Sequence, residues 1–146
     1  MMPGCVLRVA GKFFDPDAFL QVATLHAYTV WHRGEAMAET GSRASRMWEH
    51  SGFCCDVSEV DGDLRGQLRD AEAFLMRFQN DLAHLTALPT VNECQLDFGF
   101  DCRLGDGNVA VQGEYLPVSF LQLAGQLKVA VALTLYPGAG IRANHT

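Results

Sequence analysis

Short apolar runs separated by polar turns predict a series of β-strands. Four of these runs are rich in β-branched or aromatic side chains, which favour strands. They span residues 5–10, 27–31, 53–57 and 128–136. Residues 93–102 instead alternate polar and apolar side chains, as a half-buried antiparallel strand does. The run at 128–136 is almost wholly apolar and is predicted to be an interior strand.

Two further strand segments are predicted beside turn residues. Residues 46–49 precede Ser51-Gly52, which we interpret as a bend or bulge before the next strand. Residues 108–112 follow the Gly105–Asn108 turn and are predicted to pair with the strand before it as a hairpin. The intervening stretch from His32 to Ser45 is small and polar, which indicates a loop.

Three helices are predicted from spacing and capping signals. Apolar residues recur at intervals of three and four from 63 to 88, which indicates one long amphipathic helix. They are Leu64, Leu68, Ala71, Phe74, Leu75, Phe78, Leu82 and Leu85. Asp63 suits its N-cap, and Asp15-Pro16 marks the start of a short helix to about residue 24. Pro117 begins another short helix, through Leu127.

These elements together predict an α+β fold. The expected order is β-α-β-β-β-α-β-β-α-β, a mainly antiparallel sheet packed against one long and two short helices. No internal repeat or linker divides residues 1–146, so we expect a single domain with its core in 5–137. The Gly-rich end, 138–146, is predicted to be a loose tail.

Composition narrows the classes of function. The 146 residues are 49% hydrophobic and carry a net charge of −6 at pH 7, which suits a globular chain and disfavours nucleic acid as a partner. The N-terminus lacks a signal-peptide pattern, and no apolar run approaches the roughly 20 residues that span a bilayer. An odd count of five cysteines fits reduced thiols, so we expect a cytoplasmic protein without membrane attachment.

Short landmarks follow one another in a distinctive order along the chain. An early strand ending at Gly11 is followed by Asp15-Pro16, then His32-Arg33-Gly34, then Arg46 and Trp48. This order resembles that of a bacterial family, domain-of-unknown-function family 4279. One departure is Thr24-Leu25-His26-Ala27, where the family often has Leu-Gly-x-x-Pro. The resemblance covers residues 5–137 and implies a fold and a bacterial setting. It supplies no catalytic residues.

Cysteine and histidine chemistry has two interpretations. Cys54 and Cys55 lie near His50, and an imidazole can activate a thiol as a nucleophile. In a strand, however, neighbouring cysteines point to opposite faces, and at least one is more simply a small buried hydrophobe. The spacing with Cys94 and Cys102 matches no metal signature. We therefore assign no catalytic residue, metal or cofactor.

The strongest candidate site gathers cations and an aromatic ring around the polar loop. It consists of His32, Arg33, Arg43, Arg46 and Trp48. Arginines beside an indole can hold a carboxylate, a phosphate or an acidic side chain of a partner. Alternatively, Trp48 belongs to the core and the arginines pair with Glu35, Glu39 and Glu49.

Two hypotheses about function follow. The chain is predicted to be a non-catalytic module that binds a partner protein, as an immunity protein binds a toxin, because it is small, acidic and without a catalytic motif. The alternative is a small enzyme that uses a Cys/His pair or the Arg/Trp group as an anion site. A homo-oligomeric structural subunit is a third possibility.

Overall fold

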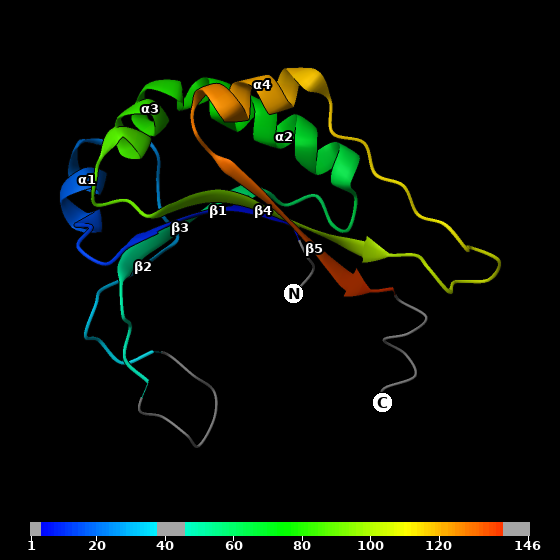
Figure 1. Cartoon of the computed structure of the whole chain (residues 1–146), viewed down its shortest axis with the longest axis horizontal. Helices are drawn as coiled ribbons and strands as arrows, with labels where there is room; N and C mark the ends of the chain where they lie inside the picture. The colour runs from blue at the N-terminus through cyan, green and yellow to red at the C-terminus, as the bar shows by residue number, and fades with distance from the viewer. Residues whose placement is uncertain (1–3, 38–45, 139–146) are drawn as a thin grey trace.

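The computed structural model describes residues 4–37 and 46–138. They form a five-stranded sheet with four helices, which confirms the predicted α+β class (Figure 1). In chain order the elements are β1 (Cys5–Gly11), α1 (Pro16–Val22), β2 (Thr29–Trp31), β3 (Ser51–Ser58), α2 (Leu64–Arg77), α3 (Gln79–Ala87), β4 (Glu93–Cys102), α4 (Val118–Gln126) and β5 (Ala130–Pro137). The tail predicted at 138–146 lies, apart from Gly138, outside the described residues.

The sheet has the strand order β2-β3-β1-β4-β5. β1 pairs antiparallel with β3 and β4, β2 pairs antiparallel with β3, and β5 pairs parallel with β4. The prediction that 128–136 is an interior strand was wrong, because β5 is the last strand of the sheet. The connection between β4 and β5, which contains α4, returns the chain to the end of the sheet where β4 starts. β5 therefore pairs parallel to β4, on its outer side.

The long helix predicted over 63–88 is two helices. Phe78 has φ −106° and ψ 25°, outside the helical range, and it separates α2 from α3. Leu82 and Leu85 remain fully buried beyond this break. The break redirects α3 relative to α2, as Figure 1 shows. Leu75 of α2 and Leu82 of α3 nevertheless belong to the same core cluster.

The two extra strands predicted at 46–49 and 108–112 are not formed. Met47 makes only an isolated bridge to Ala36, and β3 begins at Ser51 without a bend at Gly52. In the second segment the Gln112 side chain binds the Asp101 carbonyl and the Arg103 amide, at 3.0 and 2.6 Å. A side chain therefore takes up the backbone groups that a hairpin partner would have used. The turn at Gly105 is present, with the Gly105 amide donating to the Val109 carbonyl.

The helices cover one face of the sheet only (Figure 1). Between them and the sheet lies the main core, in which Phe53, Phe98 and Phe120 are fully buried. Helix capping follows the sequence: the Asp15 side chain accepts from the Ala18 amide, and Asp63 accepts from Arg65. None of the helices in the described part of the chain is long and apolar enough to cross a membrane.

Candidate partner-binding surface

The sheet face opposite the helices carries a second, smaller cluster. Strand alternation places Leu7 and Val9 in the main core and sends Ala10 to the other face, where it packs with Trp31 and Cys54. Gly52, the partner of Trp31 in β3, leaves room for the indole. A Cβ at Gly52 would lie 2.5 Å from the Trp31 ring and 2.2 Å from the Val9 carbonyl oxygen. The glycine thus lets Trp31 lie close against the sheet.

Trp48 stacks on Trp31. The two ring centroids are 5.0 Å apart with an interplanar angle of 26°. Backbone hydrogen bonds fix Trp48: its amide donates to the Glu35 carbonyl at 2.9 Å, and its carbonyl accepts from the Gly34 amide at 2.8 Å. The stack is therefore anchored by two segments that are well separated in sequence.

His50 completes the aromatic group. Trp31 Nε1 donates to His50 Nδ1 over 3.1 Å, and the imidazole lies 5.8 Å from the Trp48 ring. Because Nδ1 accepts this bond, a neutral His50 carries its proton on Nε2. His50 thereby holds the indole of Trp31 in place.

Two arginines border the indoles. The Arg8 guanidinium lies 4.9 Å from the Trp31 ring centroid, and its Nε is 3.8 Å from the Glu93 carboxylate. Arg46 and Met47 are exposed. We name Arg8, Trp31, Arg46, Trp48 and His50 the indole surface.

Two open depressions adjoin the indole surface. One, of about 510 Å³, is lined by Arg8, Met37, Arg46, Met47, Trp48, Glu49 and His50. The other, of about 530 Å³, is lined by Ala10, Gly11, Lys12, Glu49, His50, Asn92 and Glu93. Both are bordered by Glu49 and His50 and are open to solvent, a shape that suits side chains of a protein partner.

The structure divides the site that the sequence predicted. Arg46 and Trp48 lie together in the indole surface. His32 does not join them: its Nε2 lies 2.6 Å from the Asp17 carboxylate, and its Nδ1 lies 2.5 Å from Glu35. Arg33 stacks over the Phe13 ring at 5.0 Å. Arg43, like Glu39, lies outside the described residues.

Three members of the indole surface were not in the predicted site: Arg8 and Trp31, which had no assigned role, and His50, which was considered only beside the cysteines. Arg8 interrupts an otherwise apolar strand, and a charged residue between two buried neighbours, Leu7 and Val9, is the signal that marks an accessible sheet face. Trp31 was assigned to a strand without a role. Both residues meet Trp48 only through the strand order, which residue spacing does not reveal.

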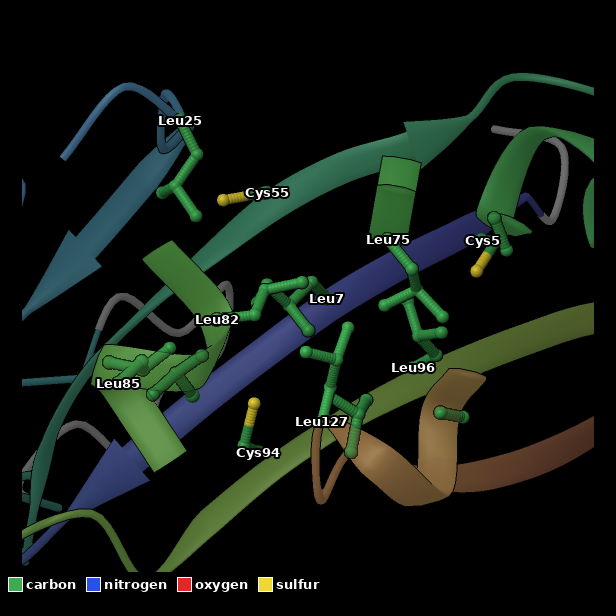
Figure 2. Packing of buried hydrophobic residues seen from close by; sticks show 14 of the residues in the cluster. Cys5, Leu7, Leu25, Cys55, Leu75, Leu82, Leu85, Cys94, Leu96 and Leu127 are labelled. Atoms are coloured by element: carbon green, nitrogen blue, oxygen red, sulfur yellow. The ribbon is translucent and has the colours of Figure 1, made fainter. Parts of the chain in front are cut away.

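The cysteines are unsuited to act as nucleophiles. Cys54 and Cys55 are 5% and 1% exposed, and Cys5, Cys55 and Cys94 point into the apolar layer beneath the helices (Figure 2). Burial raises the pKa of Cys55 to about 12 and that of Cys94 to about 12, and it also raises the pKa of Cys54. These thiols are therefore protonated at neutral pH, which disfavours the Cys/His version of the enzyme hypothesis.

Metal ligands do not gather in the described ranges. Across residues 4–37 and 46–138, no group of three or more His, Cys, Asp or Glu side chains is arranged to hold a metal ion. Comparison with known proteins adds no relative: no family model, curated protein or solved structure matches the chain. The function is therefore inferred from the geometry of the chain itself.

Proposed function

We propose that this chain is a non-catalytic module that binds a partner protein through the indole surface. The observation that carries the proposal is half-buried Trp48, which stacks on buried Trp31 and lines an open depression together with Arg8 and Arg46. Tryptophan and arginine contribute most often to the binding energy of protein interfaces. Here the rings are held by a sheet, so little conformational entropy is lost on binding.

The same geometry indicates the chemistry of the partner. A carboxylate can bind the Arg46 guanidinium, while an apolar or aromatic side chain packs on Trp48 and the 64%-exposed Met47. Arg8 is already ordered over Trp31 and adds positive charge to the same depression. We therefore infer that the partner presents an acidic residue next to an apolar one.

An immunity-type role in a bacterial cytoplasm fits these features. Immunity proteins act by covering a surface of a toxin and need no reactive groups of their own. The net charge of −6 would attract a toxin that is basic outside the contact. Membership of family 4279, as the sequence suggests, would agree with this setting.

Affinity purification with matched baits tests the proposal. The wild type, Arg46→Glu and Arg69→Glu would be used in parallel in the organism that encodes the chain. Arg69 is an exposed arginine on α2, away from the indole surface, and serves as the control. We expect one partner that wild type and Arg69→Glu retain and that Arg46→Glu loses.

The immunity role makes a further demand on that partner. Expressed alone, the partner should arrest growth, and co-expression of the wild-type chain, but not of Arg46→Glu, should restore it. Equal retention by all three baits would contradict the proposed surface. A partner with no effect on growth would contradict the immunity role and leave the binding role intact.

A further inference from the structure

β5 presents a long sheet edge to the outside of the molecule. It is the terminal strand beyond β4, and in the described part of the chain no strand pairs with its outer side. Its eight residues include no charged side chain. Leu133 and Leu135 pair with Phe98 and Phe100 of β4 and so lie on the helix side of the sheet. They are nevertheless 43% and 52% exposed. An apolar edge of this length is unusual on a chain that stays single.

The usual devices that protect a sheet edge are missing from β5. Natural edge strands are shortened, bulged, charged or interrupted by proline. At the other end of this sheet, β2 is only three residues long. In β5 the register with β4 runs without a shift from Ala130 to Pro137, and the single proline is the last residue. The edge is thus able to accept another strand along most of its length.

We propose that β5 pairs antiparallel with β5 of a second copy of this chain, forming a two-fold dimer with one continuous sheet. A register centred on Leu133 places this residue opposite its own copy and Val131 opposite the second copy's Leu135. On the other face it places Ala132 opposite the second copy's Thr134. The remaining pair on that face is Ala130 with the second copy's Tyr136. Every pair on the helix side is then apolar, and every pair on the open side includes an alanine, so no two bulky side chains oppose each other there.

The second copy fits this edge better than an unrelated strand because the pattern complements itself. Two chains of net charge −6 meet here without placing like charges opposite one another in the strands. α4, which packs against β5, exposes Val118 and Leu121 and extends the apolar area on this side. The two-fold arrangement also closes, since each β5 has one free edge.

The dimer is independent of the proposed partner binding. The indole surface lies toward β2 and the segment that follows it, at the other end of the strand order from β5 (Figure 1). Both indole surfaces of the dimer would stay accessible. Failure of one proposal therefore leaves the other unaffected.

Light scattering after size exclusion, at about 100 μM chain, tests the dimer, since contacts of micromolar Kd are then populated. We expect the wild type at twice the 16.0 kDa of one chain. Leu133→Lys should be a monomer by light scattering, because the substitution places two positive charges opposite each other in the dimer. Circular dichroism should show that this variant is folded. Val22→Lys, at a 75%-exposed valine on α1, is the matched control and should stay dimeric.

A cross-linking measurement covers the case in which Leu133→Lys fails to fold. In a Cys102→Ser background, Leu133→Cys should form an intermolecular disulfide on mild oxidation, because directly opposed residues of antiparallel strands lie within disulfide reach. Val22→Cys should not. A monomeric wild type, a Leu133→Lys dimer, open-ended aggregation or no cross-link at residue 133 would each overturn the dimer.

Discussion

Adjacent residues of β3 lie in different surroundings because a strand alternates its faces. Cys54 packs with Trp31 behind the indole surface, whereas Cys55 lies in the main core under the helices. Both thiols are buried, and for both the largest cause of the raised pKa is loss of solvent. The vicinal cysteines are thus packing residues on two separate cores.

We expect thiol labelling to show this burial directly. Of the five cysteines, only half-exposed Cys102 should react quickly with Ellman's reagent in the folded chain, and all five should react after unfolding. Cys102→Ser should remove the fast phase. Rapid modification of Cys54 or Cys55, located by mass spectrometry, would contradict the account.

His32 couples folding to pH. Its hydrogen bond to Asp17 raises the pKa of the imidazole, and the charge of Glu35 acts in the same direction. Because the pKa is higher in the folded chain, protonated His32 stabilises the fold fully when the pH is below about 6.5, the pKa of histidine in the unfolded chain. This contribution is lost as the pH rises through the pKa of His32 in the folded chain. His32 is partly exposed, so solvent reduces the effect.

The wild type and His32→Gln should therefore differ more in stability in acid than in base. The difference in their free energies of unfolding should be larger at about pH 5.5 than at about pH 8.5. By NMR titration, Asp17→Asn should lower the pKa of His32 toward its ordinary value. A difference that grows with pH would show that His32 acts in the opposite sense.

At the scale of elements, close backbone approach between β3 and its neighbours positions the indole surface. Gly52 lies under Trp31 and beside the Val9 carbonyl, where no side chain fits. The strand pairing that builds the sheet and the packing that holds the indole thus depend on one small residue.

Gly52→Ala should weaken both the strand pairing of β3 and the packing of the Trp31 indole. We expect a loss of about 1 to 3 kcal/mol in the free energy of unfolding, typical of an overpacked site, together with a weaker near-ultraviolet signal from the indole stack. Gly113→Ala is the matched control, since a Cβ there meets nothing within 4 Å, and it should change stability by about 0.5 kcal/mol or less. Equal effects of the two substitutions would contradict the proposed role of Gly52.

Local signals predicted local elements well. β4 was predicted over the residues it occupies, because alternation of polar and apolar positions is a direct consequence of strand geometry. The starts of α1 and α2 followed from Asp15 and Asp63, which cap them. The edge position of β5 and the loss of a strand at 108–112 depend on contacts across the molecule, which the pattern along the chain does not encode.

The residues of the indole surface also divide into those that are near in sequence and those that only the fold brings together. Arg46 and Trp48 are near in sequence and line one depression, while Arg8 and Trp31 join them only because β1, β3 and β2 are neighbours in the sheet. His32 was grouped by proximity in sequence but binds Asp17 of α1 instead.

At the scale of the whole molecule, the two faces of one sheet differ in what they carry. The helix-covered face holds the main core and supplies stability, and the other face carries the stacked indoles and arginines. The chain contains two tryptophans in all, and both are in the indole surface. Tryptophan emission can therefore test the proposed binding at this surface without an added label.

Selection of a random-peptide library on the wild-type chain tests the central claim most directly, with affinity read by tryptophan emission. The enriched peptides should contain Asp or Glu beside an apolar residue, and they should change the emission in a saturable way. Arg46→Glu should weaken the best peptide about tenfold or more, as loss of an interface arginine does, while Arg69→Glu should not. If no peptide is enriched, or if the best peptide binds Arg46→Glu as well as the wild type, the indole surface is not the binding site.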